Sequence, residues 1–298
     1  MSKRIMIDLH VHSSIKSFGM SFENNANPNS IDDKSCIWFE DNHLAYKETA
    51  ETYFGLARYR QSDFTNLTDG QCRIACVSLY PLEKGFVNLP LQLKPGTKNI
   101  LTYVTGIGKN RIKQIKSDDY NYFEAYKKEY EFLERLNNQI PQGGNRKYKF
   151  LEKTDDIDAT ADLLIIPTVE GCHFLCDGND TSDMYNWRFI EKNIEYVKTQ
   201  PYPLFFVSLA HHFYNDLCTH AKSFYKLVGN VLDQKNGMDD HDHSSSYKPI
   251  SNFGEGLIDL LLSTKNGTRR RILIDLKHMS KKARERYYEI LKSNKYKK

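Results

Sequence analysis

Five short apolar runs, spread along the chain, limit the folds that this sequence can adopt more than any other feature does. Each run is rich in Val, Ile, Leu or Phe. They cover residues 5–11, 73–80, 163–169, 204–209 and 272–276. Near-continuous apolar runs of this length are typical of strands that are buried on both faces of a parallel sheet. We therefore expect these runs to form parallel strands.

Helical patterns lie between the apolar runs. They cover residues 43–59, 122–137, 184–198, 251–262 and 280–291. Strands that alternate with helices indicate a parallel α/β fold, and a chain of 298 residues suits one large β/α (TIM-type) barrel. We expect a single domain over residues 1–298, with an insertion around residues 81–161. The barrel is expected to be incomplete at its C-terminal end, with about five of its eight strand-helix units.

The composition argues against several classes of protein. A net charge of +4 is too weak for a dedicated nucleic-acid binder. The N-terminus lacks the apolar stretch of a secretory leader, and no window is apolar enough to cross a membrane. The six cysteines are sparse and show no C-x2-C pair, so they are interpreted as buried thiols. These features predict a cytoplasmic protein that binds neither nucleic acid nor a membrane.

Two histidines follow one another closely at the end of the first apolar run, in Asp8-Leu-His10-Val-His12. Residues two apart in a strand point to the same side, so His10 and His12 project together. Barrel enzymes place their sites at the C-terminal ends of the strands. Two imidazoles held there are good ligands for a divalent transition metal.

Three of the later apolar runs also end in polar groups that can bind a metal or handle a proton. Glu170 follows residues 163–169, His211 and His212 follow residues 204–209, and His278 follows residues 272–276. A carboxylate at the end of an apolar strand must be paired or bound to something. Because the C-terminal ends of parallel strands lie along one edge of a sheet, we expect these side chains to form a metal site.

These motifs together resemble the amidohydrolase superfamily, and within it the membrane (renal) dipeptidases of peptidase family M19. That family has a D-x-H-x-D motif, a later E-G pair and a stretch I-D-L-S-H-x-S. The matching positions here are Asp8 to His12, Glu170-Gly171 and Ile274 to Ser280. This chain departs from the pattern in having H-x-H for H-x-D, and Lys277 in place of Ser. The family's later His, Arg and Asp have no counterpart.

The resemblance implies that His10, His12, Glu170 and His278 hold one or two divalent ions, zinc in the first place. Glu170 is then the bridging ligand and a catalytic group. His211 is implied to be catalytic and to bind substrate, with His212 beside it as a further substrate-binding residue. The function expected from the resemblance is a dipeptidase-like hydrolase that cleaves a small peptide or amide bond with a metal-activated water. A homo-oligomer that covers the open sheet edge is a further expectation.

Two alternatives remain open at this point. Asp8 to Ser13 also resembles the D-x-H-x-H-S opening of PHP-type metal-dependent phosphoesterases. The second alternative is that the chain is a truncated, non-catalytic member of the fold, which binds a metal without turnover. His241 and His243, in an Asp-rich stretch, are interpreted as part of a solvated loop.

Overall fold

The computed structural model describes nine stretches of the chain. They are residues 5–41, 60–87, 106–153, 157, 160–176, 187–222, 238–239, 244–264 and 270–293. The chain divides into two compact units. The first comprises Met1–Tyr80, Pro90–Asp118 and Glu124–Pro167, and the second comprises Pro81–Leu89, Asp119–Phe123 and Thr168–Lys298. The expectation of one domain with an insertion around residues 81–161 stays a prediction.

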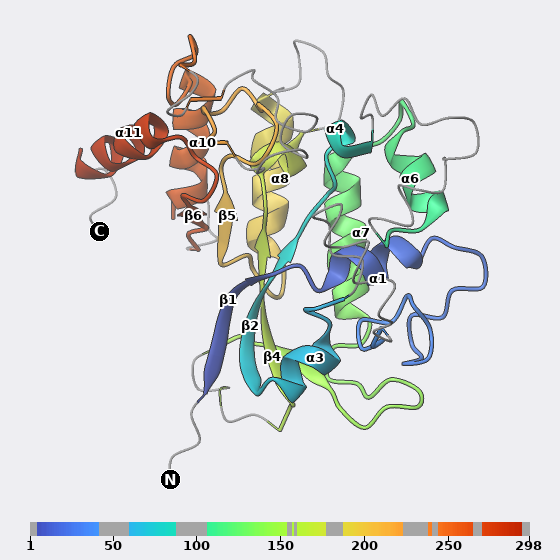
Figure 1. Cartoon of the computed structure of the whole chain (residues 1–298). Helices are drawn as coiled ribbons and strands as arrows, with labels where there is room; N and C mark the ends of the chain where they lie inside the picture. Colours follow the sequence, from blue (N-terminus) through green and yellow to red (C-terminus); the bar gives the residue numbers. More distant parts are fainter. Residues whose placement is uncertain are drawn as a thin grey trace. The chain divides into compact units, whose positions relative to one another are not determined.

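The strands confirm the parallel α/β class (Figure 1). They are β1 (Met6–Val11), β2 (Cys72–Leu79), β3 (Tyr148–Phe150), β4 (Leu163–Val169), β5 (Phe206–Ser208) and β6 (Leu273–Asp275). The sheet order is β1-β2-β4-β5-β6, with β3 paired to β4 off this path. The pairs β1–β2, β3–β4, β4–β5 and β5–β6 are parallel. Each expected apolar run contains a strand, and among the strands of the described residues only the three-residue β3 was not expected.

Helices follow most of the strands. They are α1 (Ser14–Met20), α3 (Phe64–Asp69), α4 (Lys84–Val87), α6 (Lys109–Ile115), α7 (Tyr122–Glu134), the 3-10 helix η3 (Cys172–Leu175), α8 (Trp187–Thr199), α10 (Asn252–Leu262) and α11 (Lys281–Lys292). Four of the five expected helices are present as α7, α8, α10 and α11. The fifth, over residues 43–59, lies outside the described residues. Ser280 caps α11 as expected, since its hydroxyl accepts a hydrogen bond from the backbone N–H of Ala283.

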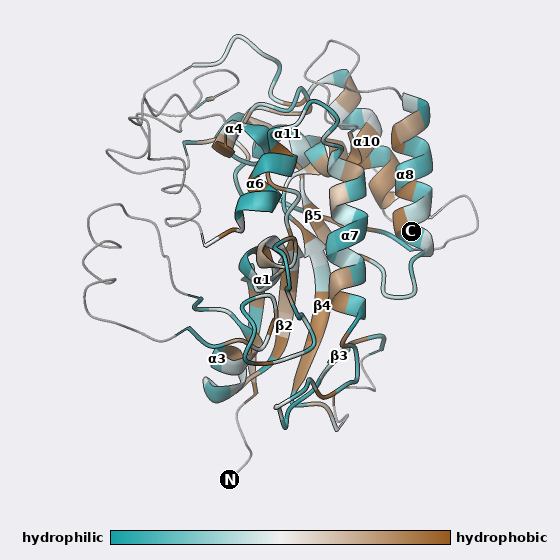
Figure 2. Cartoon of the chain, turned by 90° about the vertical axis from the view of Figure 1, so that its right-hand side faces the viewer, coloured by the Kyte–Doolittle hydropathy of each residue, from teal (hydrophilic) through white to brown (hydrophobic). Residues whose placement is uncertain are grey.

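The expected burial on both faces holds for β2 and β4 and is wrong for β1. In β2 and β4 nearly every side chain is buried, and Figure 2 shows both in the apolar colour. In β1, by contrast, Ile7 is 52% exposed and Leu9 is 66% exposed. Within the described residues β1 pairs only with β2 and so lies at the end of the strand order. An apolar run alone does not separate an edge strand from a central one.

None of the helices in the part of the chain that the structure describes has the length and the apolar character needed to span a membrane.

A buried carboxylate joins three elements of the first unit. Glu129 of α7 accepts hydrogen bonds from the Ser14 hydroxyl at 2.6 Å and from the Tyr80 backbone N–H at 2.9 Å. It thereby ties the start of α1 and the residue after β2 to α7. Burial raises the pKa of Glu129 from 4.5 to about 6, although both hydrogen bonds and the charge of Arg111 oppose the shift.

The raised pKa of Glu129 gives the stability of the first unit a pH dependence. A carboxyl whose pKa is higher in the folded than in the unfolded state stabilises the fold fully below about pH 4.5, and this contribution is lost as pH rises through about 6. The contribution amounts to about 2 kcal/mol. We expect the difference in unfolding free energy between wild type and Glu129→Gln to fall by about that amount between about pH 4 and about pH 8. Urea unfolding of both proteins measures it, and an unchanged difference contradicts the assignment.

Candidate metal centre

The first unit places His10 and His12 side by side at the end of β1, as their spacing predicts. Their Nε2 atoms lie 3.0 Å apart. Nδ1 of His12 lies 3.1 Å from the backbone carbonyl oxygen of Ser78, so it carries the proton and leaves Nε2 with a lone pair. A tetrahedral ion about 2.0–2.1 Å from each of two nitrogens holds them about 3.3 Å apart. The pair is therefore close to the geometry of two ligands of one ion.

The second unit gathers the later candidates at the ends of three strands. Glu170 follows β4 directly, His211 and His212 follow β5, and His278 follows β6. The registers of these parallel neighbours, with Val169 opposite Val207 and Ser208 opposite Asp275, bring the three strand ends level. The side chains that the sequence predicts at one edge of the sheet, from Glu170 to His278, therefore lie together in the second unit.

The side chains at this edge are close enough to share one cation. Ligand atoms of His211, His212 and His278 all lie within 4.8 Å of one another. Nε2 of His278 lies 3.0 Å from Oε1 of Glu170, and Nε2 of His211 lies 3.4 Å from Oε2 of the same carboxylate. Glu170 is buried. Imidazole and carboxylate together are a donor set that suits zinc, and also manganese, iron or cobalt.

Glu83 belongs to this cluster and was not predicted. Its Oε2 lies 2.6 Å from Nδ1 of His211, and its Oε1 lies 3.9 Å from Nδ1 of His173. Nε2 of His173 in turn donates to the Pro81 carbonyl at 2.7 Å. Glu83 comes soon after the apolar run at residues 73–80, much as Glu170 follows its own run. Its position shortly after an apolar run is the feature of the sequence that could have identified Glu83 as a site residue. The sequence instead predicts that residues 81–161 form an insertion.

The two carboxylates hold His211 in its protonated form. Burial opposes the charge on this imidazole, but the charge of Glu83 and the hydrogen bond with Glu170 outweigh it and raise the pKa of His211 to about 9. His212 is the opposite case. Burial, together with the charges of His211 and His278, lowers its pKa to about 2. The cluster therefore contains both a proton donor and a neutral imidazole.

Lys277 adds a positive charge beside Glu170. Its Nζ lies 2.7 Å from Oε1 of Glu170, and its side chain is about one third exposed. In the comparison with the dipeptidase motif, Lys277 stands where the family has Ser, and the sequence predicts no role for it. The structure gives this lysine a contact with the carboxylate at the centre of the cluster.

Two unusual backbone conformations shape the cluster. Gly171 has φ of +84°, and a Cβ at this position would lie 2.4 Å from Nδ1 of His173 and 3.2 Å from Cβ of His211. A side chain there would displace the two histidines. His278 itself has φ of +65°, a conformation that is uncommon for histidine and that its neighbours must enforce. Its carbonyl accepts a hydrogen bond from the Ala221 N–H at 2.8 Å.

The structure thus places the predicted site residues in two groups. His10 and His12 lie together in the first unit, and Glu170, His211, His212 and His278 lie together in the second. His241 and His243 lie outside the described residues. Comparison with other sequences adds no family, because no family model and no curated protein matches this chain.

Proposed function

We propose that the chain is a metal-dependent hydrolase with a divalent ion, zinc in the first place, at the strand-end cluster of the second unit. One observation carries the proposal. Three imidazoles have their ligand atoms within 4.8 Å of one another, and the buried carboxylate of Glu170 lies 3.0 Å from one of them. Ionisable groups that are buried together and have shifted pKa values are candidates for a functional site.

The contacts within the cluster indicate which residues are metal ligands and which is a hydrogen-bond donor to the substrate. His278, Glu170 and the neutral His212 are the proposed ligands. A bound divalent ion supplies a water of lowered pKa and polarises a carbonyl oxygen. His211, whose Nδ1 contacts Glu83 at 2.6 Å, is the proposed donor to the oxygen on which negative charge develops.

His10 and His12 are the proposed ligands of an ion in the first unit. Their nitrogens already stand near the separation that one ion requires, so the chain is proposed to bind one or two ions. The resemblance to the dipeptidases gives the substrate class, a small peptide or amide. It also supports the finer fold that we propose, a TIM-type barrel.

Metal content and turnover test the proposal together. Purified chain is stripped of metal, reloaded with zinc or manganese, analysed by plasma mass spectrometry and assayed on a panel of dipeptides. We expect about one to two equivalents of metal, and dipeptide hydrolysis that depends on it. The function proposed here is wrong if the reloaded chain holds no metal. Metal without turnover on any substrate points instead to a non-catalytic member of the fold.

A second candidate function rests on the opening motif. The sequence Asp8-Leu-His10-Val-His12-Ser13 fits PHP-type phosphoesterases better than it fits the dipeptidases. A phosphoester arm in the same panel distinguishes the two, since metal-dependent release of phosphate without peptide cleavage favours the phosphoesterase.

A further inference from the structure

A lysine contacts the carboxylate at the centre of the second unit's cluster. Nζ of Lys277 lies 2.7 Å from Oε1 of Glu170, and Nε2 of His278 lies 3.0 Å from the same oxygen. Consecutive residues of a strand point to opposite sides, but Lys277 and His278 lie in the turn after β6, where His278 has φ of +65°. The turn therefore brings a cation and an imidazole to one oxygen atom.

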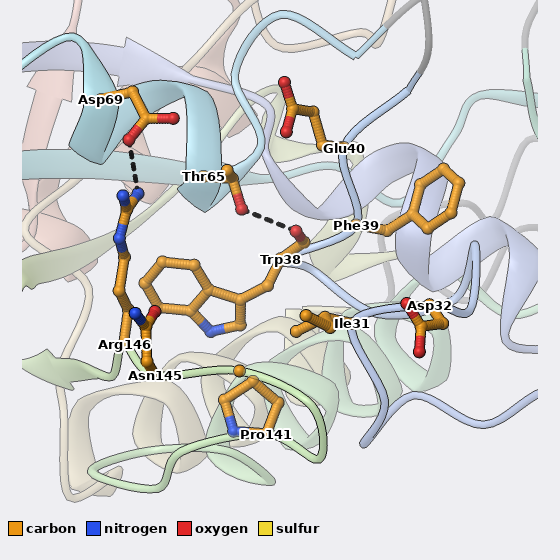
Figure 3. Close-up of a pocket in the computed structure, with 11 residues that line it drawn as sticks. Ile31, Asp32, Trp38, Phe39, Glu40, Thr65, Asp69, Pro141, Asn145 and Arg146 are labelled. Atoms are coloured by element: carbon orange, nitrogen blue, oxygen red, sulfur yellow. Dashed lines mark hydrogen bonds and ion pairs between the residues drawn. The ribbon is translucent and has the colours of Figure 1, made fainter.

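An ordinary ion pair of the same chain shows what is different about this contact. Arg146 and Asp69, which line the pocket in Figure 3, are also 2.7 Å apart. Their side chains are 36% and 53% exposed, and exposed pairs of this kind stabilise a fold little. The side chain of Glu170 is only 5% exposed, and an imidazole nitrogen lies near each of its two oxygens. Lys277 thus supplies the counter-charge of a buried carboxylate that is also a proposed metal ligand.

A divalent ion bound to Glu170 would lie very close to this ammonium. His278 marks Oε1 as the ligand oxygen, since its Nε2 lies 3.0 Å from that atom. An ion about 2.0–2.2 Å from Oε1 would stand no more than about 4.9 Å from Nζ of Lys277 in its present position. Two positive charges so close repel each other strongly in a buried cluster, which solvent and salt screen poorly. The ion and the ammonium therefore compete for Glu170.

The side chain of Lys277 has a way out of the cluster. It is 32% exposed, whereas the side chains of His211 and Glu170 are 4% and 5% exposed. A flexible stem of four carbons joins the ammonium to the backbone. The backbone N–H of Lys277 donates to Oδ1 of Asp275 at 3.0 Å, and this bond is made whichever way the side chain points. The ammonium can therefore turn toward solvent while the turn that positions His278 stays in place.

We propose that Lys277 regulates the metal centre as a built-in competitor of the ion. Its ammonium stabilises the buried charge of Glu170 while the ion is absent, and the ion displaces it on binding. This inference rests on the proposed function, because it concerns the same site. The competition lowers the affinity of the centre for metal below that of its ligands alone. A purely structural lysine has the opposite effect, since its loss would disturb Glu170 and weaken metal binding.

Zinc affinity tests the competition directly. Lys277→Leu keeps an apolar stem, removes the charge and offers the metal no ligand atom. In competition with a chromophoric chelator we expect it to bind zinc about tenfold or more tightly than the parent. Lys277→Arg keeps the charge and should stay within about threefold of the parent. All proteins carry His10→Ala, which removes the proposed ion of the first unit, so that only the second unit's centre is measured.

A second lysine of the same unit provides the matched control. Nζ of Lys282 lies 3.3 Å from Oδ1 of Asp239, whose side chain is 8% exposed. Lys282→Leu therefore removes a lysine from another buried carboxylate and should bind zinc as the parent does.

Acetylation of the wild-type chain reports the displacement itself. The chain is treated briefly with an N-hydroxysuccinimide ester of acetate, with and without zinc, and each lysine is read by peptide mass spectrometry. We expect Lys277 to react about threefold or more faster with zinc, because the ion turns its amine toward solvent. Lys281, whose side chain is 80% exposed, is the internal reference and should react equally in both conditions.

The outcomes separate this inference from the proposed function. If neither the parent nor Lys277→Leu binds zinc, the metal centre is wrong and the inference falls with it. If both bind zinc but Lys277→Leu binds it no more tightly, or if zinc leaves the acetylation of Lys277 unchanged, the inference alone is overturned. Zinc bound by Lys277→Leu and not by the parent supports both. Circular dichroism checks the fold of each variant, and the acetylation of wild type decides alone if Lys277→Leu does not fold.

Discussion

The His278→Asn variant is expected to lose the metal that the wild-type chain binds while it keeps its fold. The substitution removes the imidazole whose Nε2 lies 3.0 Å from Glu170. Loss of an outer contact to a metal ligand already lowers affinity about 10–100-fold, so loss of the ligand itself should lower it by at least about 100-fold. Competition with a chromophoric chelator measures the affinity directly.

The backbone at His278 decides which substitution to use. With φ of +65°, this position strains alanine, whereas asparagine and glycine adopt the conformation readily. His278→Asn and His278→Gly should therefore both lose the metal, and His278→Ala should in addition unfold at a lower temperature. Asp216→Asn, at a second position with positive φ in the same unit, is the matched control and should keep the metal. Wild-type affinity in the Asn and Gly variants would remove His278 from the ligand set.

The second large effect is expected at Glu83, which we regard as a positioning residue for His211. Glu83→Gln keeps an acceptor for Nδ1 of His211 but removes the negative charge that favours its protonated form. We expect turnover to fall about 10–100-fold, as for other groups that orient an active-site histidine. The fall should appear in kcat more than in KM. Glu83→Ala should also destabilise the chain by about 1–3 kcal/mol, because it leaves a buried polar partner behind.

A spectroscopic measurement separates positioning by Glu83 from simple structural support. The 2.6 Å contact between Nδ1 of His211 and Glu83 should give a far-downfield imidazole proton resonance. That resonance should disappear in Glu83→Gln with little change elsewhere in the spectrum. Glu255→Gln, which breaks an ion pair with Arg286 on the same unit, is the control and should leave both the resonance and the turnover intact. A Glu83→Gln enzyme with wild-type kcat contradicts the assigned role.

The sequence predicted the strand ends well because apolar runs and chain direction determine them. The run at residues 163–169 matches β4 residue for residue. Since parallel strands end along one edge of a sheet, the sequence alone predicts that Glu170, His211 and His278 lie together. In the second unit Glu170 lies 3.0 Å from Nε2 of His278 and 3.4 Å from Nε2 of His211.

The parts that sequence reasoning missed depend on contacts between distant residues. Glu83 meets His211 across 128 residues, and no local pattern records such a pairing. The strand β3 has only three residues with a lysine in the middle, which is too short for a period to be visible. The exposure of Leu9 in β1 depends on strand order. The positive φ of His278 depends on how its neighbours hold the backbone.

The buried cysteines allow local unfolding of the two units to be measured separately. All six are buried, with Cys36, Cys72 and Cys76 in the first unit and Cys172, Cys176 and Cys218 in the second. Burial raises the pKa of Cys76 to about 11 and that of Cys172 well above its usual value, so these thiols hardly react while the fold is closed. Their alkylation must wait for local opening. Peptide mass spectrometry of partly alkylated protein therefore ranks the two units by the free energy of exposing their interiors.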